Sequence, residues 1–194
     1  MCDVPAHFGK FNEVTPERGI YSSLVQFLPF HGSEHFRPKH GIVEIFAEDI
    51  SQIPAQQAGM WTRPDVAAVS LRRARFARTK ELDLISFEVK TFRGTDIASV
   101  HQALAQAQFV NRSYLVWNRP FCTCGDSNYS AIEQSCRKYG VGLLTVHDPS
   151  NLQTFEFRIS PQRNELTPDE LDEFIVTRFS QSAKQMIEAA IRQP

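Results

Sequence analysis

The spacing of apolar residues changes along the chain, and each change predicts a new element of secondary structure. Near the start, apolar side chains recur at helical spacing behind a Thr-Pro-Glu start signal, which predicts a helix that Thr15 caps and Pro29 ends. From His31 to Gln57 the sequence mixes Gly, Pro and His with short apolar runs, so it predicts an excursion with one short strand or helix. Two strands follow, near Met60 to Leu71 and near Leu82 to Phe92.

The second half of the chain alternates between helical and strand patterns. Helices are expected at Ile97–Asn111 and at Ser127–Tyr139, the second of which stops at Gly140. Strands are expected at Tyr114–Trp117 and Val141–Val146, and an alternating edge strand at Phe155–Ile159. Strands separated by helices indicate a parallel portion of sheet. The sequence therefore predicts a mixed α/β fold.

A C-terminal helical extension is predicted for about residues 167–191, behind a cap at Thr167. Its apolar face packs either on the core of the same chain or on a second copy, and the sequence leaves both open. The length of 194 residues suits one domain, residues 1–194, with a core at about 15–160.

Composition excludes some classes of protein. Apolar residues make up 42% of the chain, enough for a substantial core, yet no apolar run approaches the ~20 residues that a membrane span needs. We therefore expect no membrane partner. The N-terminus lacks the basic and apolar regions of a secretory signal, so we expect a cytoplasmic location.

The net charge of −1 argues against nucleic-acid binding through a globally positive surface, but one segment is strongly basic. Ten residues that contain no acid carry five cations: Arg72, Arg73, Arg75, Arg78 and Lys80. Such a cluster can contact backbone phosphates, and its position predicts that it lies beside the candidate site described next. The alternative is a solvated hairpin.

Two carboxylates and a lysine form the most informative pattern in the sequence. Glu88 and Lys90 lie two residues apart on one expected strand, so they share a face. Asp65 joins them if its own strand lies alongside as a hairpin partner. Mg²⁺ takes oxygen ligands and only one or two carboxylates, which Asp65 and Glu88 can supply, while Lys90 can stabilise charge near a phosphate. Taken singly, Asp65 is a common turn residue and Glu88 and Lys90 suit an exposed edge strand.

The segments Arg63–Asp65 and Phe87–Lys90, followed by a helix and a strand, resemble the PD-(D/E)XK, or restriction-endonuclease-like, nuclease superfamily. The resemblance covers about Glu17 to Val146 in the order of its elements. It implies a restriction-endonuclease-like mixed sheet flanked by helices and a Mg²⁺- or Mn²⁺-dependent endo- or exodeoxyribonuclease. In this interpretation Asp65 and Glu88 hold the metal ion, and Asp65, Glu88 and Lys90 form the catalytic centre. DNA is the expected nucleic-acid substrate.

The same resemblance suggests supporting residues. Gln102 fits the first position of a Gln-x-x-x-Tyr pattern found in one branch of the superfamily. At the last position of that pattern this chain has Gln106 in place of Tyr. Gln102 and Gln106 lie one helical turn apart, and both can reach a phosphate or a metal-bound water. Glu17 on the first helix is a candidate third metal ligand, with Glu44 as its rival.

Other interpretations remain open beside the nuclease. The chain can be a non-catalytic nucleic-acid-binding or scaffolding subunit that keeps the fold, and it can form a homodimer or join a larger complex. The cysteines do not match a familiar metal or iron–sulfur spacing: Cys2, Cys122, Cys124 and Cys136. Cys136 is expected to pack as a small apolar residue in a helix.

Overall fold

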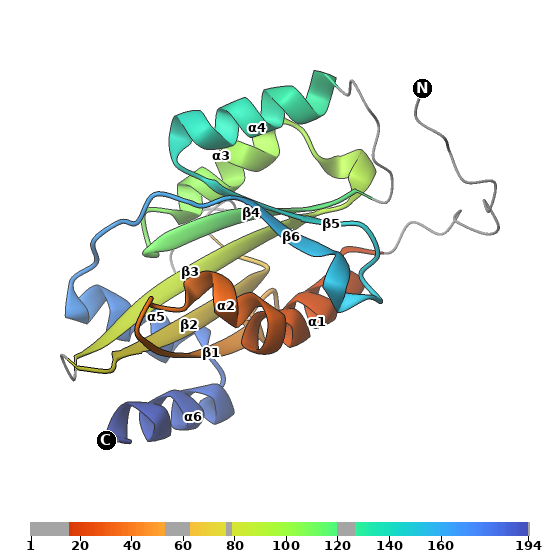
Figure 1. Ribbon diagram of the computed structural model, residues 1–194. Helices are drawn as coiled ribbons and strands as arrows, with labels where there is room; N and C mark the ends of the chain where they lie inside the picture. Colours follow the sequence, from red (N-terminus) through yellow and green to blue (C-terminus); the bar gives the residue numbers. More distant parts are fainter. Residues whose placement is uncertain (1–15, 53–62, 77–78, 120–126, 194) are drawn as a thin grey trace.

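A computed structural model describes residues 16–52, 63–76, 79–119 and 127–193, and within these residues the chain forms a six-stranded mixed sheet with helices on both faces (Figure 1). The strands follow chain order across the sheet: β1 (Gly41–Asp49), β2 (Val66–Ala74), β3 (Lys80–Lys90), β4 (Arg112–Asn118), β5 (Gly142–Val146) and β6 (Phe155–Ile159). The first three strands are antiparallel, β3, β4 and β5 are parallel, and β6 is antiparallel to β5. The expected α/β class, the parallel portion and the edge strand at 155–159 are confirmed.

Helices cover the two faces of this sheet in separate groups. Their bounds are α1 (Glu17–Phe27), α2 (Ser33–Phe36), α3 (Ile97–Gln106), α4 (Ser127–Tyr139), α5 (Pro168–Arg178) and α6 (Gln181–Arg192), with short turns η1 (Leu28–Gly32), η2 (Phe92–Gly94) and η3 (Leu152–Thr154). Neighbouring residues of β2 show the division, because Val66 packs in the α1 core and Ala67 packs with α5 and α6. A third core joins α3 and α4 to β4 and β5.

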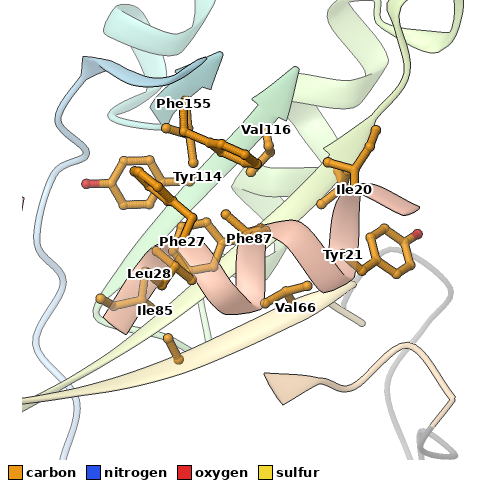
Figure 2. Close-up of a cluster of buried hydrophobic side chains, with 14 of the residues drawn as sticks. Ile20, Tyr21, Phe27, Leu28, Val66, Ile85, Phe87, Tyr114, Val116 and Phe155 are labelled. Carbon is orange, nitrogen blue, oxygen red and sulfur yellow. The ribbon is translucent and has the colours of Figure 1, made fainter. Parts of the chain in front are cut away.

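The core beneath α1 is rich in aromatic side chains (Figure 2). The ring centroids of Phe27 and Phe155 lie 4.7 Å apart, and those of Phe87 and Tyr114 lie 5.3 Å apart. Gly142 makes room for this packing, since a Cβ at that position would meet the Tyr114 ring at 2.3 Å. This core fixes α1 against β2 and β3, and it thereby places the N-terminal turn of α1 near the candidate site.

The N-terminal helix differs from the sequence expectation at both ends. Pro16 is extended and stands before the first helical residue, while Thr15 lies outside the described residues. Pro29 does not end the helical path, which widens into the π-helical turn η1 and continues into α2. A proline inside a helical path removes the hydrogen bond to the carbonyl four residues earlier, and its ring clashes with that carbonyl, so a local widening of the helix is the expected response.

Two further expectations need correction. The segment 41–49 is a nine-residue strand, β1, where a short strand or helix was expected, and it pairs with all of β2. The helix expected to reach Asn111 ends at Gln106. By contrast, α4 has the expected bounds, and Gly140 follows it with a φ of +69°, the left-handed conformation that favours glycine after a helix.

The C-terminal extension folds back onto its own sheet. Two helices replace the single one expected, because the chain turns at Phe179 and Ser180 and begins α6 with a new cap. Phe174, Phe179 and Ile187 pack with residues of β2 and β3 in one buried cluster. The choice left open by the sequence is therefore decided in favour of the chain's own core. None of the helices in the described residues has the length and apolar character that a bilayer span requires.

Candidate active site

Asp65 and Glu88 meet at the end of the β2–β3 pair. Asp65 directly precedes β2, and because Val66 pairs with Phe87 in antiparallel register, the next step places Asp65 opposite Glu88. Glu88 lies near the carboxyl end of β3, which borders the parallel strands. In open α/β sheets ligands commonly bind outside the carboxyl ends of parallel strands. The predicted pairing of the two carboxylates across neighbouring strands is present.

The Asp65 carboxylate ties three elements together. Its Oδ1 accepts a hydrogen bond of 2.8 Å from the Tyr21 hydroxyl of α1, and its Oδ2 accepts one of 2.8 Å from the backbone N–H of Val89 in β3. The second bond lies just beyond Val66, the first residue of β2, and joins the side chain of Asp65 to the backbone of β3. Asp65 is thus held in one orientation by partners on α1 and β3, as a fixed ligand requires.

Glu88 is buried, with 7% of the residue exposed, and each of its carboxylate oxygens has a partner. The Lys90 ammonium lies 2.8 Å from Oε1, and the Gln106 amide of α3 donates to Oε2 at 2.5 Å. The predicted sharing of a face by Glu88 and Lys90 is confirmed by this ion pair. Lys90 keeps 18% of its side chain exposed, so the pair lies at the rim of the sheet rather than in its centre.

The site holds more negative charge than Lys90 offsets. Burial, followed by the charge of Asp65, raises the pKa of Glu88 to about 7, although Lys90 and Gln106 oppose this rise. Burial likewise raises the pKa of Asp65, against the hydrogen bonds from Val89 and Tyr21. Burial works to lower the pKa of Lys90, but the surrounding acids, Glu88 first, raise it above its usual range. A divalent cation would relieve the repulsion between the two carboxylates.

Two more acids belong to this electrostatic group. Glu17, half-buried in the first turn of α1, contributes to the raised pKa values of Tyr21 and Lys90. Asp49 at the end of β1 contributes to the raised pKa of Asp65, and no pattern in the sequence marks it as part of the site. Asp49 was missed because the sequence does not predict that β1 is a long strand whose end lies beside the start of β2.

Glu44, the rival of Glu17, lies elsewhere. Its carboxylate forms an ion pair of 2.7 Å with Arg73 on the neighbouring strand. Arg73 is eight residues along β2 from Asp65, about 26 Å at roughly 3.3 Å per residue. Glu44 is therefore too far away to join a metal ion between Asp65 and Glu88.

The two glutamines of α3 differ in their surroundings. Gln106 is 1% exposed and contacts Glu88, so it is a buried neighbour of the carboxylates rather than a surface residue open to nucleic acid. Gln102 is half-buried and, within the described residues, its side chain has no hydrogen bond. The part played by Gln102 in catalysis stays a prediction.

The arginines expected to flank the site lie at the far end of β2. Arg72 pairs with Glu81 and Asp83, at 3.0 and 2.9 Å. Arg75 lies just beyond β2, and Arg78 falls outside the described residues. The expectation that Arg72, Arg73 and Arg75 border the carboxylates is wrong, because an extended strand separates the two groups by more than 20 Å. Their contact with nucleic acid stays a prediction.

The residues around Glu88 suit a hard divalent cation. Among the described residues, no group of three or more His, Cys, Asp or Glu side chains is gathered closely enough to hold a metal ion. A pair of carboxylates nevertheless meets the need of Mg²⁺, which keeps several waters. The Oε1 of Gln106 is buried without a hydrogen-bond partner in the described part of the chain, and an oxygen in that position suits a cation or a water bound to it.

The cysteines contribute nothing to this site as far as the structure describes them. Cys136 is buried in α4 without a disulfide, and burial raises its pKa to about 12, so its thiol is unreactive, as expected of a packing residue. Cys2, Cys122 and Cys124 lie outside the described residues.

Comparison with known proteins assigns the chain to no family. No family model matches the chain, and no curated protein matches it. One similar solved structure is a protein of unknown function from Silicibacter pomeroyi, with a TM-score of 0.46 and 14% sequence identity. The alignment covers 94% of this chain and 97% of that one.

Proposed function

We propose that this protein is a metal-dependent nuclease of the restriction-endonuclease-like type, which hydrolyses phosphodiester bonds in nucleic acid, with DNA as the expected substrate. One observation carries the proposal: Asp65 and Glu88 come together from adjacent strands, and Lys90 lies 2.8 Å from Glu88. Two carboxylates beside an ammonium group supply what phosphodiester hydrolysis needs, a metal ligand pair and a cation for developing charge.

Each side chain of the site has a distinct task in this proposal. Asp65 and Glu88 would hold Mg²⁺ or Mn²⁺, which neutralises charge on the scissile phosphate and lowers the pKa of a bound water. Tyr21 and the Val89 N–H keep Asp65 oriented, and Gln106 keeps Glu88 oriented. Lys90 stabilises negative charge on the phosphate or on the attacking water.

The raised pKa of Glu88 favours this function over a purely structural ion pair. A structural pair is stabilised when both partners stay charged, whereas burial raises the pKa of Glu88 to about 7 despite the neighbouring ammonium. Strongly displaced titration of buried, coupled groups is characteristic of functional sites. Two carboxylates beside one ammonium group give the site a formal excess of negative charge, which a bound cation would offset.

The test is Mg²⁺-dependent nicking of supercoiled plasmid, with cleavage of a labelled duplex as a second substrate. The variants Lys90→Ala and Asp65→Ala are expected to lose at least about 100-fold in rate, the usual contribution of a positioned catalytic group. Lys138→Ala on α4 is the matched control and is expected to retain the wild-type rate. Equal activity in all four proteins refutes the proposal, and nucleic-acid binding without cleavage by the wild type favours a non-catalytic binding subunit.

A further inference from the structure

A hollow lined by basic side chains lies at the opposite end of the β1–β2 pair from Asp65. Its volume is about 530 Å³, and none of the residues that line it is acidic. We call it the basic pocket, and its defining residues are Lys39, His40, Gly41, Arg73 and Arg75. β1 is the outermost strand of the described sheet, and the basic pocket lies at the end of the β1–β2 pair opposite to Asp65.

The basic pocket has a surplus of positive charge. Glu44 offsets the charge of Arg73, but in the described part of the chain no carboxylate pairs with Lys39 or Arg75, and both are exposed. The Arg75 guanidinium lies 5.3 Å from the ring centroid of Phe76, and Phe76 is 80% exposed. Two unneutralised cations therefore line the basic pocket, and one of them, Arg75, lies beside an aromatic ring that is open to solvent.

The backbone fixes the shape of the basic pocket. Gly41 approaches β2 so closely that a Cβ there would lie 2.2 Å from the carbonyl oxygen of Arg73. The backbone N–H of Arg75 donates to the carbonyl of His40 at 3.2 Å. These contacts hold residues 39–41 against residues 73–75, so the cations of both segments surround the same hollow.

We propose that the basic pocket binds the sugar–phosphate backbone of a nucleic acid at a distance from the cleavage site. This inference rests on the proposed nuclease function and assigns that function a second contact with its substrate. Lysine and arginine side chains bind phosphates through charge, and an exposed aromatic ring next to them suits stacking with an unpaired base. No surface of this kind is required by the chemistry at Asp65 and Glu88.

The geometry sets the length of substrate that reaches both places. Asp65 and Arg73 are eight residues apart along β2, about 26 Å at roughly 3.3 Å per residue. Nucleotides follow one another at about 3.4 Å along each strand of a duplex, so 26 Å corresponds to about eight steps. The basic pocket therefore holds a phosphate about eight nucleotides from the bond that is cut.

The test measures binding without cleavage, by fluorescence anisotropy of a labelled duplex of about 16 base pairs in EDTA over a series of salt concentrations. The pocket variant is Lys39→Gln with Arg75→Gln, and the control is Arg137→Gln with Lys138→Gln, which removes two exposed cations from α4. Each lost phosphate contact reduces the slope of log K against log[salt] by about 0.9, so the pocket variant loses about 1.8. At 0.1 M salt this weakens binding by at least about tenfold, while the control binds as the wild type does.

A second measurement separates this inference from the proposed function. In Mg²⁺ the pocket variant is expected to raise KM for the 16-base-pair duplex and not for one of about six base pairs. Unchanged affinity and salt slope in the pocket variant overturn the inference and leave cleavage at Asp65 and Glu88 intact. Absence of cleavage by the wild type defeats the proposed function, and the anisotropy result still decides the basic pocket. Wild-type binding to phosphatidylserine vesicles but not to the duplex also overturns the inference, in favour of a membrane surface.

Discussion

The pH dependence of stability gives a sharp test of the Glu88 environment. The pKa of Glu88 rises from its ordinary value of 4.5 to about 7 in the folded protein, chiefly because the side chain is buried. At a pH between these two pKa values, Glu88 keeps a proton in the folded state that it has released in the unfolded state. The free energy of unfolding therefore decreases as pH rises through the window from about 4.5 to about 7.

The size of the effect follows from the two pKa values. At about 1.4 kcal/mol per pKa unit, the difference corresponds to about 3 kcal/mol of stability that is present at pH 4.5 and lost above pH 7. The raised pKa of Asp65 adds a loss of the same sign as pH rises. Replacement of Glu88 by Gln keeps the side-chain shape and removes the titration, so Glu88→Gln is expected to lose less stability between pH 5 and pH 8.

Urea unfolding at several pH values between 5 and 8 measures this, with the fluorescence of the buried Trp117 as a signal. Glu133→Gln on α4 is the control, since it removes a carboxylate that forms a surface ion pair with Arg137. The expected result is a wild-type curve that falls more steeply with pH than that of Glu88→Gln, by about 3 kcal/mol over the range. Parallel curves for the two proteins would refute the assigned environment of Glu88.

Two further predictions concern groups that hold the site and the sheet together. Tyr21→Phe removes the hydroxyl that donates to Asp65, so the pKa of Asp65 is expected to rise further. Mn²⁺ affinity, measured by calorimetry at pH 6, is expected to decrease. The free energy of unfolding is expected to be lower by about 1.5–3 kcal/mol. An unchanged Mn²⁺ affinity would count against Asp65 as a ligand. Asp83→Asn leaves the guanidinium groups of Arg72, Arg112 and Arg163 without their shared buried carboxylate. We expect the free energy of unfolding to decrease by about 3–5 kcal/mol and Tm by about 10 °C. The control Glu133→Gln is expected to lose less than about 1 kcal/mol. A Tm within about 2 °C of the wild type would contradict the structural role given to Asp83.

Local sequence determined those elements whose signals are contained within a few residues. The cap at Thr167, with Glu170 reaching back to it, starts α5 as expected, and Gly140 ends the helix before β5. Alternation along a strand was enough to place Glu88 and Lys90 on one face, because side-chain direction in a strand has a period of two. Short-range rules of this kind need no knowledge of what packs against the element.

Tertiary structure decided whatever depends on how strands pair and where they end. The long β1 was not recognised, because its pairing with β2 stabilises a segment whose own pattern is mixed, and Asp49 was missed for the same reason. The arginines between the two halves of the motif are close to Asp65 in sequence, yet an extended strand moves Arg73 about 26 Å away and makes it part of the basic pocket. Gln106 rather than Gln102 contacts Glu88, and this depends on how α3 packs against β3, which the spacing of the two glutamines along the chain does not specify.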